Sequence, residues 1–249
     1  MMILIFSDFH FTGPYSGAMQ AAVMRHAGKN AGIVNLMLDA PDRDPMRSAY
    51  LLASLRREFG VGDIGLCVVD PGVGSARRAV VAQCDGAFFV GPDNGLFEMV
   101  IRRAQNVRLW QIDWEPEGAS ASFHGRDIFG PVAGMLAANT DFARHELAVD
   151  ARFADARNWP DDLAEVIYID GYGNAMTGLR ANMVLATAPV LTVGDLEIGR
   201  ARTFSDVPAG HAFWYENSFG LVEIAVNGGR ADQLPGLGVG SKVNWTGAT

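Results

Sequence analysis

The chain has 249 residues, of which 49% are hydrophobic and 19% charged, as in folded globular proteins and unlike disordered ones. A formal net charge of -8 and the lack of a long Lys/Arg run argue against a nucleic-acid-binding surface. No apolar stretch approaches the roughly 18 residues that span a membrane, and the first residues indicate a strand rather than a signal peptide. We therefore expect a cytoplasmic protein without membrane or nucleic-acid partners.

The first 150 residues alternate between predicted strands and helices, an order typical of a mostly parallel α/β domain. Strands are predicted at 2–7, 33–38, 64–69, 79–83, 87–90 and 107–112, and helices at 17–28, 45–59, 94–104 and 127–138. Asp44 before Pro45 has the composition of an N-cap followed by a first-turn proline. The sequence Cys84-Asp85-Gly86 indicates a hairpin turn. Cys67 and Cys84 fall inside apolar predicted strands, so buried free thiols are expected rather than a disulfide or a metal pair.

Beyond residue 150 the character of the sequence changes. Residues 151–162 are polar and contain proline, which indicates a linker. From 163 to 249 the apolar runs are short and separated by turn residues: VIYID, VLTVG, HAFWYE and GLVEIAVN. This pattern predicts a small all-β domain. The expected organisation is thus an α/β domain over 1–150, the linker, and a β domain over 163–249.

The stretch VVDPGVGSARR, residues 68–78, places a carboxylate and two arginines around a glycine-rich turn. Asp70 closes a predicted parallel strand at its carboxyl end, where open α/β sheets bind ligands. The third glycine of the dinucleotide-binding motif would fall on Arg77, and no helix follows, so that motif is not indicated. The glycines are better explained by a tight turn that approaches a ligand closely.

Two more carboxylates, Asp8 and Asp93, also stand at the ends of predicted strands. Each alone could be a turn former or a loop cap. Because three strand ends carry an acid, we expect these carboxylates to share one polar crevice. Arg77 and Arg78 are neighbours, so one of them could point into that crevice, although both could also face solvent.

His124 precedes a glycine at the mouth of an apolar predicted helix and is the preferred proton acceptor, with His10 as the second candidate. The other histidines are expected at the surface or in the core: His26, His145 and His211. No two histidines stand at ligand spacing on one helix and the cysteines are not paired, so no metal site is predicted.

Two glycine-bounded loops of the second domain carry polar and aromatic side chains, IDGYGN at 169–174 and YENSFG at 215–220. Each could be merely a turn. Their composition also suits a flat heterocycle, because an aromatic face can stack on it and an amide can hydrogen-bond to its edge.

Six motifs in this order resemble the S-adenosylmethionine hydrolases that form adenosine, relatives of the S-adenosylmethionine-dependent fluorinase and chlorinase. They are SDF near the N-terminus, VVDPGVG with its following arginine, GPDNGLF, FHGRDIFGPVA, IDGYGN and NSFGLVEIAVN. The resemblance covers nearly the whole chain and implies an N-terminal α/β sandwich followed by a smaller β-barrel-like domain. It also implies a homotrimer whose active sites lie between the N-terminal domain of one subunit and the C-terminal domain of the next.

By this resemblance, Asp70, Arg77 and His124 would form a hydroxide-generating triad, and Asp8 would hold the ribose hydroxyls. The remaining expected substrate contacts are Tyr172 and Phe204 flanking the adenine, Asn174 on its edge, Asp170 and Ser218 on the methionine amine and carboxylate, and Asn94 and Asn217 without an assigned role. No cofactor is expected, because S-adenosylmethionine would be the substrate and adenosine and methionine the products.

These residue types suit the reaction that the resemblance implies. The 5′ carbon of the substrate bears a sulfonium that leaves as a neutral thioether, so no general acid is needed. Arg77 would stabilise the developing hydroxide, His124 would accept or relay its proton, and Asp70 would orient the pair. Two departures concern substrate contacts: His10 stands where relatives usually have glycine, and residues 39–46 lack a histidine often found there.

Two other functions remain to be weighed. A halogenase of the same superfamily carries a tyrosine or another non-acidic residue where this chain has Asp70, since a carboxylate would repel a halide. Residues 70–90 also look too short for the additional loop of the fluorinase. A non-catalytic protein could bind S-adenosylmethionine or a nucleoside through the same crevice; the intact triad argues against it, while His10 leaves room for it.

Overall fold

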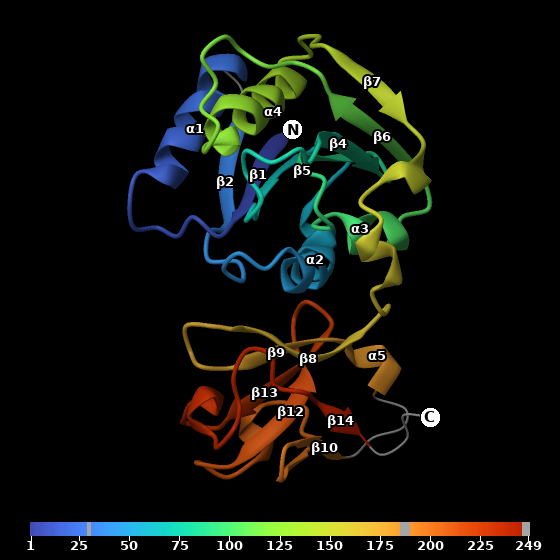
Figure 1. Ribbon diagram of the computed structural model, residues 1–249. Helices are drawn as coiled ribbons and strands as arrows, with labels where there is room; N and C mark the ends of the chain where they lie inside the picture. The colour runs from blue at the N-terminus through green and yellow to red at the C-terminus, as the bar shows by residue number, and fades with distance from the viewer. Residues whose placement is uncertain (29–30, 185–189, 246–249) are drawn as a thin grey trace. The chain divides into compact units, whose positions relative to one another are not determined.

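The computed structural model describes residues 1–28, 31–184 and 190–245, and the chain divides into two compact units, Met1–Trp159 and Pro160–Thr249 (Figure 1). The first unit is built on a seven-stranded sheet in the order β2-β1-β3-β5-β4-β6-β7. Its strands are β1 (Met2–Ser7), β2 (Gly32–Met37), β3 (Ile64–Val68), β4 (Ala79–Cys84), β5 (Ala87–Pro92), β6 (Val107–Ile112) and β7 (Arg144–Leu147). Its α-helices are α1 (Tyr15–His26), α2 (Pro45–Ser54), α3 (Glu98–Arg103) and α4 (Gly130–Ala137).

The large sheet is mixed, so the prediction of a mostly parallel sheet is wrong for half of it. β2, β1, β3 and β5 run parallel, whereas β4 is antiparallel to both β5 and β6, and β7 is antiparallel to β6. The cause is the predicted hairpin: Asp85 and Gly86 both have positive φ, 47° and 85°, the backbone of a tight two-residue turn that reverses the chain.

Alternate side chains of the central strands face two different layers of helices. Ile3 and Ile5 of β1 belong to one apolar cluster with Met19 of α1 and Val132 of α4. On another part of the sheet the ring of Phe89 packs between those of Phe59 and Phe97, which flank α2 and α3 in sequence. Figure 1 shows α1 and α4 together on one side of the sheet and α2 and α3 on the other.

The helices begin close to the predicted positions. Asp44 caps α2, its carboxylate accepting the backbone N–H of Arg47 at 2.9 Å, and Pro45 is the first helical residue, as predicted. The helix ends earlier than expected, at Ser54, and a 3₁₀ turn, η1 (Leu55–Glu58), follows. α4 is preceded by a π-helical turn, η2 (Gly125–Phe129), a wide turn often found at functional sites.

Much of the segment that the sequence indicates as a linker lies within the first unit. Two 3₁₀ turns, η3 (Val149–Ala151) and η4 (Asp155–Asn158), follow β7. Arg152 donates to both carboxylate oxygens of the buried Glu98, at 2.6 and 3.0 Å. Arg102 in turn donates to the carbonyl of Trp159 at 2.7 Å. These contacts fix the chain as far as the boundary at Trp159.

The second unit contains two antiparallel sheets, with strand orders β12-β13-β9-β8 and β11-β10-β14. Its strands are β8 (Leu163–Ile169), β9 (Ala175–Arg180), β10 (Val190–Val193), β11 (Leu196–Gly199), β12 (Ala212–Glu216), β13 (Leu221–Val226) and β14 (Asn244–Trp245). Short helical turns are α5 (Ala181–Val184), η5 (Phe204–Asp206) and η6 (Ala231–Gln233). The unit has its own apolar core, centred on the fully buried Trp214.

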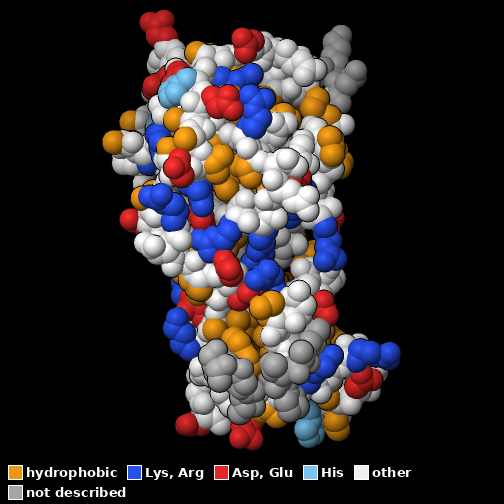
Figure 2. Space-filling model, turned by 90° about the vertical axis from the view of Figure 1, so that its right-hand side faces the viewer, with side chains coloured by type: hydrophobic (Ala, Val, Ile, Leu, Met, Phe, Trp, Pro, Cys, Tyr) orange, Lys and Arg blue, Asp and Glu red, His pale blue; other side chains and the backbone are white. Residues whose placement is uncertain are grey.

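Both cysteines are buried and free, as predicted, and burial raises the pKa of both thiols, that of Cys84 to about 12. Among the described residues, no helix has the length and apolar character needed to cross a membrane. Figure 2 shows Lys and Arg side chains interspersed with Asp and Glu over the face that it presents.

Candidate functional site

A cavity of about 520 Å³ opens on the first unit where β1, β2 and β3 end. Loops after these strands meet the loop before η2 there, at the sheet edge where α/β proteins bind ligands. The lining residues are Asp8, Phe9, His10, Thr12, Tyr15, Arg43, Val68, Asp70, Val73, Ser122, Phe123, His124 and Gly125. Two of the three expected strand-end carboxylates therefore share this cavity.

Asp70, Arg77 and His124 form one hydrogen-bonded cluster. Nε of Arg77 donates to both carboxylate oxygens of Asp70 at 3.0 Å, and its Nη2 donates to Oδ2 at 2.5 Å. The same Nη2 donates to Nδ1 of His124 at 2.8 Å. The ring of Phe129 covers the guanidinium at 5.1 Å, and the side chains of Arg77 and Asp70 are only 9% and 5% exposed. The arginine is thus a fixed cation between an acid and an imidazole.

Arg77 determines the protonation state of His124. A guanidinium has no acceptor, so Nδ1 must be the unprotonated nitrogen and the neutral ring carries its proton on Nε2. Burial, followed by the positive charge of Arg77, holds the pKa of His124 below its ordinary value of 6.5. The imidazole is therefore neutral at pH 7 and has an accepting nitrogen directed at the cation.

The turn that carries Asp70 and Arg77 fits closely against the loop that carries His124. Gly74 has φ of +81°, and a Cβ at this position would lie 2.6 Å from the carbonyl oxygen of Ala121. From the other side, Asp127 accepts the backbone N–H of Ser120 at 2.9 Å and so fixes the same loop. The glycine allows two backbone segments to meet, whereas the sequence predicted a close approach to a ligand; Asp127 was not foreseen from the sequence.

Asp8 lies in the same cavity with one oxygen already engaged. Its Oδ2 accepts the backbone N–H of Arg43 at 2.9 Å. Burial raises the pKa of Asp8, although the bond from Arg43 opposes that shift. Asn94 does not line the cavity but supports it: its Nδ2 donates to the carbonyl of Val69 at 2.9 Å, at the strand end next to Asp70.

Asp93 lies outside the shared crevice, so the expectation for the third strand-end carboxylate is wrong. Arg78 donates to its Oδ2 through Nε and Nη2 at 2.9 and 2.6 Å, and Phe153 N–H donates to its Oδ1 at 2.9 Å. Arg78 also donates to the carbonyl of Ala151. Successive residues of an extended chain face opposite ways, so Arg77 turns towards Asp70 and His124, which line the cavity, and Arg78 turns away to anchor the segment after β7.

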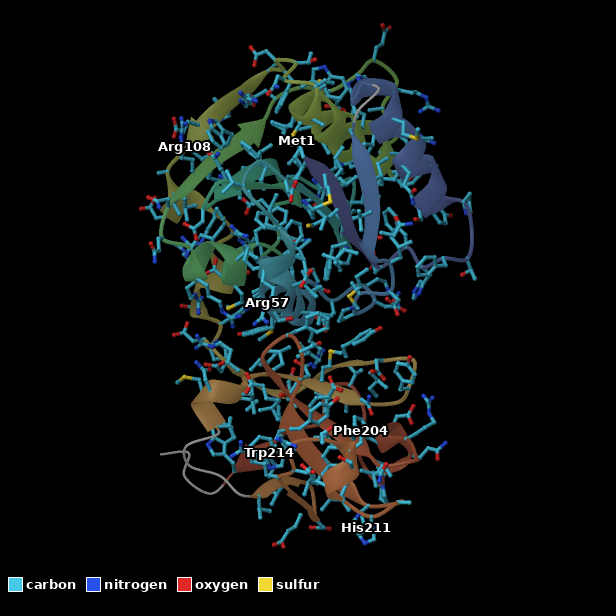
Figure 3. All side chains as sticks on the ribbon, turned by 180° about the vertical axis from the view of Figure 1, so that it is seen from behind. Met1, Arg57, Arg108, Phe204, His211 and Trp214 are labelled. Carbon is cyan, nitrogen blue, oxygen red and sulfur yellow. The ribbon has the colours of Figure 1, made fainter. Side chains whose placement is uncertain are left out.

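The remaining histidines take no part in the Asp70–Arg77–His124 cluster. His26, His145 and His211 are exposed, His211 on the second unit (Figure 3). His10 lines the cavity, donates through Nε2 to Oδ1 of Asp42 at 2.9 Å, and has φ of 57°. Within the described residues no group of three or more His, Cys, Asp or Glu side chains could hold a metal ion.

In the second unit, Asp170 organises the loop between β8 and β9. Its Oδ1 accepts the backbone N–H groups of Tyr172 and Asn174 at 2.9 Å, and its Oδ2 accepts Nδ2 of Asn174 at 3.2 Å. Asn174 is only 7% exposed, whereas the ring of Tyr172 projects into solvent with 81% exposure. The loop therefore displays an aromatic face beside a carboxylate.

The other expected contacts of this unit surround Tyr215 of β12. The ring of Phe204 on η5 (Figure 3) packs edge-on against Phe213 and Tyr215, with centroids 5.0 and 5.6 Å apart. Asn217 and the exposed Ser218 stand in the turn between β12 and β13. Glu223, which the sequence did not single out, accepts from both the Tyr215 hydroxyl and Asn217 Nδ2.

Comparison with known proteins agrees with this arrangement of two units. The N-terminal domain of SAM hydroxide adenosyltransferase matches residues 3–146, and the C-terminal domain of the same family matches residues 164–244. The chain belongs to the SAM hydroxide adenosyltransferase family. The cavity lies within the residues matched to the N-terminal domain, and Tyr215 with its neighbours Phe204, Phe213 and Glu223 lies within those matched to the C-terminal domain.

Relatives of the SAM hydroxide adenosyltransferase family are similar over nearly their full length. A Thermus thermophilus protein named (R)-S-adenosyl-L-methionine hydrolase is 35% identical over 97% of this chain and 98% of its own. A Salinispora arenicola protein of the same name is 33% identical over 96% and 95%. Among solved structures, an uncharacterized conserved protein from Thermotoga maritima matches with a TM-score of 0.83 at 25% identity, covering 98% of this chain and 99% of its own.

Proposed function

We propose that this protein hydrolyses S-adenosyl-L-methionine to adenosine and L-methionine by attack of an activated water at the ribose 5′ carbon. The observation that carries the proposal is the Arg77 guanidinium, which is bonded at once to Asp70 and to Nδ1 of His124. The family and the printed names of the relatives support the substrate.

In the proposed reaction, water enters between Arg77 and His124 and replaces their direct 2.8 Å bond. Its oxygen accepts from the guanidinium, and one of its protons points to Nδ1 of His124. A lone pair of the water oxygen attacks the 5′ carbon, the carbon–sulfur bond breaks, and its electrons remain on sulfur as the neutral thioether of methionine. The water proton passes to Nδ1. The cation stabilises the negative charge that develops on oxygen, while Asp70 keeps the cation in place.

The proposal assigns binding to Asp8 and to the second unit. Asp8 retains Oδ1 for a ribose hydroxyl. Tyr172 and Phe204 would flank the adenine, and Asn174 would approach its edge. Asp170 and Ser218 would bind the methionine amine and carboxylate. We further propose a cytoplasmic homotrimer in which the α/β sandwich of one subunit faces the β-barrel-like domain of the next, with no cofactor.

The test is incubation of the protein with S-adenosylmethionine, with and without chloride, followed by separation of the nucleosides. Adenosine and methionine in equal amounts are expected in both cases. A 5′-halogenated nucleoside would instead reveal a halogenase, and unchanged substrate with measurable binding would reveal a binding protein. Either result would refute the proposal.

A further inference from the structure

A buried carboxylate in the second unit takes no part in the proposed chemistry. Glu223 lies in the middle of β13, directly opposite Tyr215 of β12, and is only 3% exposed. Placing a carboxylate among apolar strands is costly unless hydrogen bonds compensate it. Its neighbours along the strand are apolar and fully buried, Val222 and Ile224. The position would suit a hydrophobic residue, so the acid requires an explanation.

Both oxygens of Glu223 are used, and each is bonded to a different side of the proposed binding region. Oε1 accepts from the hydroxyl of Tyr215, and Oε2 accepts from Nδ2 of Asn217 at 2.8 Å. Burial is the main reason why the pKa of Glu223 is raised. The two bonds join β12, β13 and the turn between them through a single side chain.

On one side, Tyr215 supports the aromatic wall. Its ring packs against Phe204 at 5.6 Å and against Phe213 at 5.5 Å. The hydrogen bond to Glu223 fixes the position of the hydroxyl end of the ring against which Phe204 packs. Phe204 is the residue proposed to flank the adenine.

On the other side, Asn217 shapes the turn that presents Ser218. Its Oδ1 accepts the backbone N–H groups of Phe219 and Leu221, both at 3.0 Å, so its carbonyl has no capacity left for a substrate. Its Nδ2 is held by Glu223. Asn217 is therefore a residue of the turn itself, and Glu223 sets its orientation.

We propose that Glu223 is a positioning residue that fixes the adenine-side aromatic wall and the methionine-side turn relative to each other through Tyr215 and Asn217. The inference rests on the proposed function, because it takes S-adenosylmethionine as the ligand of these two elements. It predicts an effect on substrate binding that is separate from the chemistry assigned to Arg77 and His124.

The experiment compares KM and kcat for S-adenosylmethionine among three variants. Glu223→Ala should raise KM at least about tenfold while kcat changes less than about threefold. Glu223→Gln should keep KM within about threefold of the wild type, because its amide oxygen can still accept from Asn217 and its amide N–H can donate to the Tyr215 oxygen. Thr177→Val is the matched control: it removes a buried hydrogen bond to the carbonyl of Val222 in the same sheet and should leave KM unchanged.

A folded Glu223→Ala variant with wild-type KM would overturn the inference, as would an equal rise in KM for Thr177→Val. If Glu223→Ala does not fold, Tyr215→Phe decides: it keeps the ring and removes the hydroxyl, and an unchanged KM would overturn the inference equally. Adenosine formation by the wild type tests the proposed function, whereas the ratio of variant to wild-type KM tests the role of Glu223. A wild type that forms no adenosine refutes the proposed function, whereas an unchanged KM ratio in an active enzyme refutes only the role of Glu223, so the two failures are distinguishable.

Discussion

The two units each contain a buried carboxylate, and the difference lies in what binds it. Asp70 of the first unit is bound by a guanidinium, which remains charged at all accessible pH values. Glu223 of the second unit is bound by a phenol and an amide, which are neutral. Both carboxylates are nearly inaccessible to solvent, so burial alone does not distinguish them.

Because their partners differ in charge, we expect the Asp70 cluster to serve catalysis and Glu223 to serve substrate binding. The cation beside Asp70 also reaches His124, so that cluster can stabilise charge that appears only in the transition state. Neutral donors around Glu223 supply geometry without net charge, which favours ground state and transition state alike. The first cluster should therefore control kcat, and the second should control KM.

The largest effect is expected from Arg77→Ala. Removing the cation that stabilises the developing hydroxide should lower kcat by about 10²- to 10³-fold, the usual effect of losing one charge-stabilising donor, with a small change in KM. Steady-state kinetics with S-adenosylmethionine measures both. Arg78→Ala is the matched control, because this adjacent arginine binds Asp93 outside the cavity and should retain kcat. A folded Arg77→Ala variant that hydrolyses S-adenosylmethionine at a rate comparable to that of the wild type would contradict the catalytic role of the Asp70–Arg77–His124 cluster.

A smaller loss of kcat is expected from Gly74→Ala. The new Cβ would meet the carbonyl of Ala121 at 2.6 Å and would separate Arg77 from His124, so a decrease of about 10- to 100-fold is expected from misplaced catalytic groups. At Gly72 the added Cβ would meet Ser75 Oγ at 3.4 Å, an ordinary contact, which makes Gly72→Ala the control. Equal kinetics for the two variants would show that the close approach of the two loops is not needed.

Several features of the fold could be predicted from short stretches of the sequence. The cap at Asp44, the hairpin at Asp85-Gly86 and the two buried thiols depend on residues adjacent in the chain. In contrast, β7 has the mostly exposed sequence RHEL, which has no apolar alternation, and its strand is recognised only from its pairing with β6. The hairpin reverses the chain locally, but the pairing of β4 with β6 and of β6 with β7 joins strands that are distant in sequence.

For the candidate site, too, the sequence predicted what depends on neighbouring residues but not what depends on contacts between distant ones. Asp70 could be placed at a strand end from its own neighbours, whereas the choice between Arg77 and Arg78 depends on which face of the chain meets the cavity. No role was predicted for Glu223, because the sequence GLVEIAVN is almost entirely apolar and so resembles that of an ordinary buried strand. The pairing of β12 with β13 brings Tyr215 to one carboxylate oxygen of Glu223, and the turn between these strands brings Asn217 to the other.

The pH dependence should distinguish the two kinetic constants further. His124 must be neutral to accept a proton, and its pKa is held below 6.5, so kcat should persist below pH 6.5 and decline only as pH falls through that lowered value. Asp8 must be ionised to accept a ribose hydroxyl, and burial raises its pKa from 3.8, so its protonation should appear as an increase in KM at acid pH. Profiles of kcat and KM from about pH 4 to about pH 8 provide the measurement. A kcat limb at or above pH 6.5 would contradict the proposed role of Arg77 in keeping His124 neutral.

The smallest effect, on stability, is expected at His10, which lines the cavity of the first unit. A non-glycine residue at φ of 57° is strained, and the exposed pair with Asp42 offsets little of that cost. His10→Gly should therefore be more stable than His10→Ala by about 1 kcal/mol, because both lose the pair but only glycine relieves the strain. Urea unfolding of both variants measures the difference. Because His10 lies next to Asp8 and outside the Asp70–Arg77–His124 cluster, kcat should be the same in both variants. Equal stability would show that the loop adopts another backbone conformation, and unequal kcat would show that the binding side and the catalytic cluster of this unit are coupled.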